Sequence, residues 1–184
     1  MTRSRHLLAP RRFWTADEVA ELRRRYPDEA TAAIAATLER ASPRLRLMIE
    51  FARRTGWRQT DIRQLQVQQL GADRIALVQS KTKMRQEWEI TPELRAILTA
   101  AEALPGRARS MFVFPMRDGR GVSARTFQSE WYRVNPGFQF RAIRKLAINQ
   151  AISAGVNGTD FAGHHDPRTT RQHYDMTAKR VKPL

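Results

Sequence analysis

Two segments near the end of the chain, FRAIRKLA at residues 140–147 and GVNGTDFAGHHDPRTTRQHYD at residues 155–175, decide how the rest is interpreted. Between them they hold two arginines one helical turn apart, two adjacent histidines and a tyrosine, namely Arg141, Arg144, His164, His165 and Tyr174. Guanidinium groups bind phosphate through several N–H donors and keep their charge at every ordinary pH. Histidine adds a donor or proton carrier near neutral pH, and a tyrosine hydroxyl can attack phosphorus. The combination predicts a phosphoryl-transfer site that acts on a nucleic-acid backbone.

Each of these residues also has an ordinary structural interpretation. Two arginines on one helix face are by themselves more typical of a solvated surface, and tandem histidines of a cap or loop. A lone tyrosine is usually half-buried packing. Only the combination, together with the segments upstream, favours chemistry over structure.

The composition narrows the class of partner. The chain has 184 residues, enough for one domain and a small appendage, and 41% of them are hydrophobic. A net charge of +15 and a pI near 11.5 indicate a polyanionic partner, most simply double-stranded DNA or RNA. There is no cysteine, which excludes disulfides and thiolate metal sites, and we expect no metal or other cofactor. No apolar run approaches the length of a membrane span and no signal-peptide pattern is visible at the start, so we expect no membrane partner and a cytoplasmic protein.

The first forty residues divide into two parts. Residues 1–12 are basic and show no hydrophobic period, which indicates an arm that can lie along phosphates. Residues 13–41 predict two short helices, the first beginning at a capping box of Thr15 and Glu18. This pair resembles the opening of a Myb/SANT-like helix-turn-helix, whose tryptophan would be Trp14. A plain helical hairpin packed on the main domain fits the same residues equally well.

The remainder predicts an α+β domain, mostly helical, over residues 42–176, followed by a basic tail at residues 177–184. A helix begins at Ser42-Pro43, a cap residue followed by proline in the first turn. A second helix is expected to begin around Arg58 and to continue through Leu70. An arginine at such a start can reach a phosphate, and Asp61 could brace it.

A small antiparallel β-hairpin follows. Residues 74–79 alternate with Ile75 and Leu77 on one face, and residues 86–90 return after a polar turn. Lys81 therefore lies at the hairpin tip, where a long flexible ammonium group can enter a groove. Several helices follow before the histidines, and Thr159 is expected to cap the last short one.

The order of these segments resembles the catalytic domain of the tyrosine recombinases, the phage integrase family. The resemblance runs from about Leu45 to Tyr174 and includes TGWRQTDIRQL at residues 55–65, VQSKTKMRQEWEIT at 78–91, FRAIRKLA and GHHDPRTTRQHY. It implies a nucleophile, two phosphate-binding arginines, a mobile lysine, a histidine and a supporting acid: Tyr174, Arg58, Arg144, Lys81, His164 and Asp61. It also implies that the protein works as a tetramer on DNA, without a cofactor.

Three departures from the family pattern leave alternatives open. Arg141 replaces the histidine of the usual His-x-x-Arg motif and is a poor proton carrier at neutral pH. The spacing from His164 to Tyr174 is one residue longer than usual, so either His165 is the functional histidine or His173 occupies the usual tyrosine position. About forty residues precede the expected domain, too few for the helical core-binding domain that family members usually carry.

These departures define two hypotheses about function. The first is a site-specific recombinase or integrase that cuts and rejoins DNA through a 3′-phosphotyrosyl intermediate. The second is an integrase-derived DNA-binding protein without strand-transfer activity. A ribosomal or RNA-binding basic protein would explain the charge but not the ordered motifs.

Overall fold

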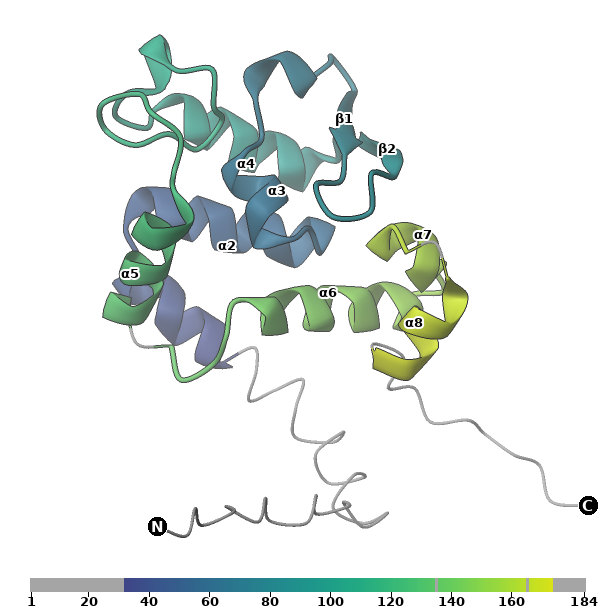
Figure 1. Ribbon diagram of the computed structural model, residues 1–184. Helices are drawn as coiled ribbons and strands as arrows, with labels where there is room; N and C mark the ends of the chain where they lie inside the picture. Colours follow the sequence, from purple (N-terminus) through teal and green to yellow (C-terminus); the bar gives the residue numbers. More distant parts are fainter. Residues whose placement is uncertain (1–31, 135, 165, 174–184) are drawn as a thin grey trace, which may run out of the picture.

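The computed structural model describes residues 32–134, 136–164 and 166–173. The predicted basic arm, the capping box with Trp14, and the C-terminal tail lie outside the described residues, as do His165 and Tyr174. Figure 1 shows a mostly helical molecule with one small two-stranded sheet, so the predicted fold class is confirmed.

Helix α2 (Pro43–Thr55) forms the centre of the core. Ser42 caps it by accepting from the backbone N–H of Leu45, and Pro43 occupies the first turn, as the sequence predicts. The apolar stripe predicted for this helix is fully buried and consists of Leu45, Met48, Ile49 and Ala52. Helix α2 packs on α6 (Arg141–Ser153) and on α4 (Pro92–Glu102), and residues 32–40 are also helical.

The hairpin consists of β1 (Arg74–Val78) and β2 (Arg85–Glu89), paired antiparallel. Ile75 and Leu77 face the core, as the alternation predicts. On the facing strand the Trp88 ring contacts Phe161 edge to face, with ring centroids 5.1 Å apart. This contact joins the hairpin to α7 (Gly158–Ala162), which Figure 1 shows beside the end of α6.

Two local predictions were wrong. Helix α3 (Gln59–Arg63) ends well before Leu70, and a short 3-10 turn, η1 (Val67–Gln69), follows it. The reason is a tertiary pairing. Gln66 forms an isolated antiparallel β-bridge with Phe112, which requires extended backbone at Gln66 and is not compatible with a helix continuing through it. Helix α7 is capped by Asn157, whose side chain accepts from two backbone N–H groups, and not by Thr159.

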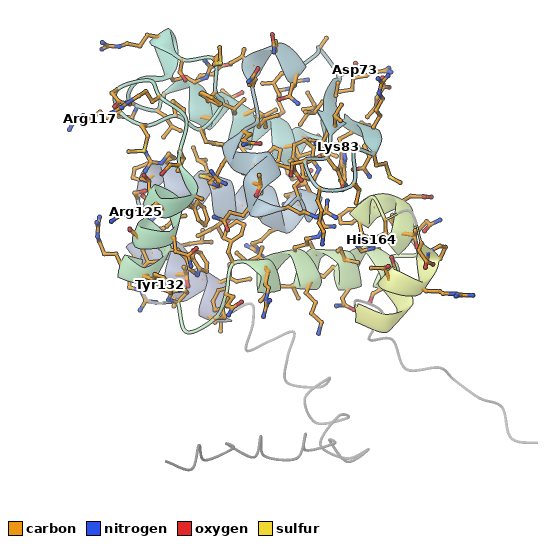
Figure 2. The ribbon with its side chains drawn as sticks, in the orientation of Figure 1. Asp73, Lys83, Arg117, Arg125, Tyr132 and His164 are labelled. Atoms are coloured by element: carbon orange, nitrogen blue, oxygen red, sulfur yellow. The ribbon has the colours of Figure 1, made fainter. Side chains whose placement is uncertain are left out.

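The remaining elements complete the frame around the site. A 3-10 turn, η2 (Arg107–Arg109), and α5 (Ala124–Val134) lie between α4 and α6, and α8 (Pro167–His173) follows α7. Figure 2 shows Arg117 and Arg125 on the opposite side of the view from His164. No helix in the part of the chain that the structure describes is long and apolar enough to cross a bilayer.

We expect the tight junction at Gly56 to be sensitive to a single methyl group. Gly56 has φ +61°, and a Cβ there would lie 2.9 Å from the Phe161 ring, whereas Gly155 has φ +82° and open space around it. Gly155→Ala should lower the free energy of unfolding by about 1 kcal/mol through backbone strain alone, and Gly56→Ala by about 2–3 kcal/mol. Urea denaturation of both variants measures the difference. Equal losses would show that the contact with Phe161 does not matter.

Candidate functional site

Arg58 lies at the junction between α2 and α3. Gly56, in the left-handed conformation, ends α2, and Arg58 occupies the N-cap position of α3. Its side chain is 19% exposed. One Nη1 hydrogen is donated to the Gln79 side-chain oxygen, and the same nitrogen lies 4.0 Å from a carboxylate oxygen of Asp61. The guanidinium is therefore held from one side and reaches solvent on the other.

Asp61 links α3 to the hairpin turn. The carboxylate is buried, and its Oδ1 accepts a hydrogen bond of 2.9 Å from the backbone N–H of Ser80. The other oxygen faces Arg58 at the 4.0 Å ion-pair distance. The supporting acid of the sequence analysis is thus placed between the first arginine and the turn that carries Lys81.

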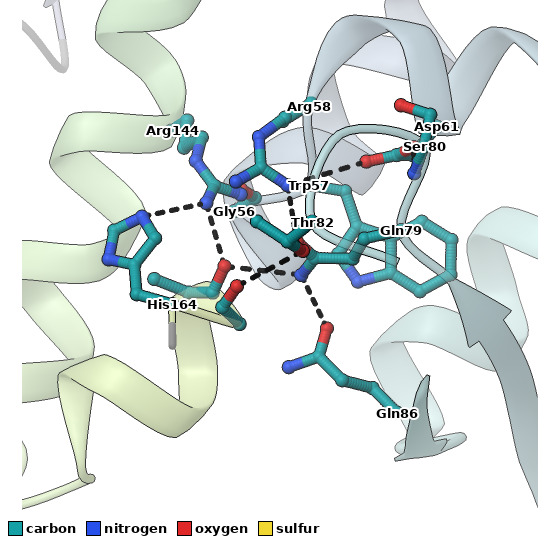
Figure 3. Close-up of polar contacts among 12 residues, drawn as sticks. Gly56, Trp57, Arg58, Asp61, Gln79, Ser80, Thr82, Gln86, Arg144 and His164 are labelled. Atoms are coloured by element: carbon teal, nitrogen blue, oxygen red, sulfur yellow. Dashed lines mark hydrogen bonds and ion pairs between the residues drawn. The ribbon is translucent and has the colours of Figure 1, made fainter. Parts of the chain in front are cut away.

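Arg144 projects from α6 into the interior and is 6% exposed. Its Nη1 donates to the carbonyl oxygen of Gly56 at 2.5 Å, and its Nη2 donates to that of Ala162 at 2.8 Å. Nη2 also lies 3.5 Å from Nε2 of His164. These contacts, drawn in Figure 3, bring the second arginine together with the first arginine's segment and with the histidine.

His164 is the histidine that faces Arg144. It follows Gly163, which ends α7 in the left-handed conformation, and its backbone N–H bonds to the Thr159 carbonyl at 3.0 Å. Its Nδ1 lies 2.9 Å from the hydroxyl of Thr170 on α8. The ring is therefore oriented from both nitrogens, by a threonine on one side and a guanidinium on the other.

Lys81 and Arg141 are both exposed. Lys81 lies in the hairpin turn between Ser80 and Thr82, each of which is hydrogen-bonded to other parts of the site. Arg141, in the first turn of α6, lines a cavity of about 460 Å³ between α5, α6 and the start of α3, together with Gln59. Arg144, one helical turn further along α6, is buried and does not line this cavity, so the two arginines of the motif lie in different surroundings.

Gln79 is a residue of this region that the sequence did not lead us to expect. Its amide is buried among Arg58, Thr82, Gln86 and the carbonyl of Ala162, and it contacts all four (Figure 3). A signal was present, because Gln79 continues the inward-facing alternation of Ile75 and Leu77. A polar residue at an inward strand position must find partners in the interior.

The site thus collects two guanidinium groups, an imidazole and a buried carboxylate from three separate segments: α3 with its N-cap, α6, and the residue that follows the end of α7. Two cations close together favour an anion with several acceptor oxygens, and phosphate is, with carboxylate, a group whose geometry the planar guanidinium matches. No group of three His, Asp or Glu side chains suited to a metal ion occurs among the described residues. The arrangement suits charge stabilisation on a phosphate.

Comparison with known proteins assigns the family. Residues 23–180 match the model of the phage integrase family. The chain belongs to this family. A comparison with curated proteins gives no match.

Solved structures of similar fold include integrases and recombinases. A lambda integrase dimer bound to a COC′ core site superposes with a TM-score of 0.69 at 18% identity, covering 86% of this chain and 61% of the other. The lambda integrase catalytic core superposes with a TM-score of 0.61 at 19% sequence identity, covering 75% of this chain and 93% of the other. XerA recombinase superposes with a TM-score of 0.63 at 15% sequence identity, covering 80% of this chain and 56% of the other. This phage integrase family member therefore has the catalytic-domain fold and spans 61% of the first of these chains.

We expect the Thr170 hydroxyl to control the orientation of His164. Thr170→Val keeps the shape but removes the partner of Nδ1, so it should lower the free energy of unfolding by about 1–2 kcal/mol. It should also change the tautomer equilibrium of His164, which ¹⁵N NMR of the imidazole measures. The neighbouring Thr169→Val is the matched control. If the His164 imidazole spectrum of Thr170→Val were the same as that of Thr169→Val, the role assigned to Thr170 would be contradicted.

Proposed function

We propose that this chain cuts and rejoins DNA at specific sites through a 3′-phosphotyrosyl intermediate, with Tyr174 as the nucleophile. The observation that carries the proposal is the convergence of Arg58, Arg144 and His164 from three separate segments on one small region. Membership of the phage integrase family supports it. So does the substrate of a structural neighbour, XerH, which was crystallised on its difH site in a pre-cleavage complex.

The proposed reaction exchanges one phosphoester bond for another. The Tyr174 oxygen forms a bond to the scissile phosphorus and loses its proton, while the bond from phosphorus to the 5′-oxygen breaks. Lys81 donates a proton to that leaving oxygen, which departs as a 5′-hydroxyl. Because the phosphotyrosyl ester conserves the phosphoester bond, attack by a 5′-hydroxyl of a partner strand reseals DNA by the reverse reaction.

Arg58, Arg144 and His164 would stabilise the charge that develops on the phosphate oxygens in the transition state. Donors fixed before reaction cost no reorganisation during it, and loss of one such donor typically costs about 3–4 kcal/mol in the barrier. Arg58 is partly exposed and can present N–H groups directly. Arg144 is fixed by carbonyl oxygens, which orient its charge without neutralising it.

Arg141 would bind DNA without transferring protons. It is exposed at a cavity that also touches Gln59, the residue next to Arg58. A phosphate held at Arg58 would therefore leave neighbouring DNA within reach of Arg141. A guanidinium there adds attraction and no acid–base function.

The assembly and the compartment are part of the same proposal. A lambda integrase tetramer bound to a Holliday junction matches this fold with a TM-score of 0.67 at 18% identity. We propose that this chain also acts as a tetramer on double-stranded DNA, in the cytoplasm where that DNA lies.

One observation favours a second function, binding of DNA without strand transfer. His164 contacts both Arg144 and Thr170, which supports it over His165 as the histidine of the proposed site. In the family pattern the tyrosine follows the histidine at a fixed spacing. Counted from His164, that position is His173, the last residue of α8, and Tyr174 lies one residue beyond it. A tyrosine displaced in this way could fail to reach the phosphate.

A nicked suicide substrate separates the two functions. DNA from the attachment region of the chain's own host element, nicked beside the scissile phosphate, should trap a covalent protein–DNA band on denaturing gels. Tyr174→Phe should abolish the band and His173→Phe, the matched change one residue away, should retain it. The reverse pattern would place the nucleophile at position 173. Bound DNA without any band from the parent would replace the recombinase proposal with the binding function.

Lys81 can be tested through the leaving group. Lys81→Ala should slow cleavage of ordinary DNA by about 100-fold or more, as expected for loss of a general acid. Sulfur in place of the bridging 5′-oxygen leaves without a proton and should restore most of the rate. Lys83→Asn removes a charge from the same turn at a residue with φ 58°, which asparagine tolerates, and should cleave like the parent. Slow cleavage of the sulfur substrate by Lys81→Ala would exclude the proton-donor role.

A further inference from the structure

Gln79 uses every hydrogen-bonding position of its amide. The oxygen accepts from the Arg58 guanidinium and, at 2.9 Å, from the Thr82 hydroxyl. The nitrogen donates to Gln86 at 2.6 Å and to the Ala162 carbonyl at 3.1 Å. A primary amide has two lone pairs and two N–H bonds, so nothing is left over. Gln79 is 1% exposed, so these four protein contacts are made away from solvent.

The partners fix which way the amide points. A guanidinium can only donate and a carbonyl oxygen can only accept, so the oxygen must face Arg58 and the nitrogen must face Ala162. A flipped amide would lose both bonds, because its N–H groups would then face the Arg58 guanidinium and its oxygen would face the Ala162 carbonyl oxygen. The direction of the amide is therefore determined, and so is the side from which Arg58 is held.

The same carbonyl joins Gln79 to the second arginine. The oxygen of Ala162 accepts from Gln79 at 3.1 Å and from Arg144 at 2.8 Å. Close approach is possible because the next residue is Gly163, where a Cβ would lie 2.0 Å from the Gln79 nitrogen. A chain of contacts thus runs from Arg58 through Gln79 and Ala162 to Arg144, and Figure 3 labels Arg58, Gln79 and Arg144 along it.

We propose that Gln79 is a positioning residue that sets the direction of the Arg58 guanidinium relative to Arg144 and His164. The inference rests on the proposed function, since it names a further residue for the same reaction. A neutral acceptor orients a guanidinium without cancelling its charge, which stays available for phosphate. A carboxylate in this place would orient Arg58 equally well but would neutralise it.

Asp61 does not replace this function. One of its oxygens is occupied by the Ser80 N–H, and the other lies 4.0 Å from Arg58, beyond hydrogen-bond distance. It supplies a field at Arg58 but no directional bond. The direction of the guanidinium therefore depends on Gln79.

The test compares Gln79→Met and Gln79→Glu with the parent and with Gln69→Met. Gln69 is the matched control because it bonds to the Ala76 carbonyl on the same hairpin, away from the arginines. Gln79→Met should slow single-turnover cleavage by about 100-fold, the usual effect of a misplaced group, and Gln79→Glu by at least as much. DNA affinity should change little, because it is spread over many phosphate contacts. Gln69→Met should cleave like the parent.

Two readouts separate positioning from other causes. A sulfur leaving group should not rescue Gln79→Met, since the defect concerns Arg58 and not proton donation by Lys81; full rescue would overturn the inference. ¹⁵N relaxation of the Arg58 Nε–H should show a restrained side chain in the parent and a mobile one in Gln79→Met. An equally restrained Arg58 in the variant would overturn the inference as well.

The NMR readout needs no cleavage, so the two proposals fail separately. A parent that binds DNA but forms no covalent adduct overturns the proposed function, whatever Arg58 does. A parent that forms the adduct, with both Gln79 variants cleaving at its rate, overturns the positioning role alone. Thermal unfolding of each variant within a few degrees of the parent confirms that the comparison concerns the folded protein.

Discussion

The burial of the Arg144 guanidinium is the constraint on which the rest of the site depends. A cation removed from water destabilises a fold unless other polar groups replace its hydration. The carbonyl oxygens of Gly56 and Ala162 do so, at 2.5 and 2.8 Å. Both lie at helix C-terminal ends, of α2 and α7, where carbonyl groups lack helical partners and the helix dipole favours a cation. One charge and two helix ends therefore stabilise each other and fix how the three helices meet.

The hairpin is attached to this centre by side chains and not by its own strands. A two-stranded hairpin alone is marginally stable in water. Here the turn is held through Ser80 by Asp61 and through Thr82 by Gln79, on either side of Lys81. The Lys81 side chain is therefore exposed while the backbone on either side of it is held in place.

Local signals in the sequence were enough to predict much of the fold. The Ser42-Pro43 start and the alternation around Ile75 lie within a few residues, and the structure confirms both. The helix expected through Leu70 failed because a distant partner, Phe112, pairs with Gln66, and periodicity cannot reveal such a contact. The place of Gln79 in the site depends in the same way on segments far along the chain. Spacing predicted the two arginines as site residues, but only the folded chain shows which groups contact them.

The two arginines differ in burial, and each has a property that the other lacks: Arg144 is rigidly held, whereas Arg58 keeps N–H donors available for a ligand. A guanidinium that is buried and bonded to carbonyl groups is rigid, but part of its donor capacity is already used. A guanidinium that is partly exposed keeps donors for a ligand, but it loses more conformational entropy when it is ordered. In the proposed reaction Gln79 would reduce that second cost, because it already holds Arg58 from the interior side. Preorganisation of this kind favours the transition state, because the work of orienting the charge is done during folding.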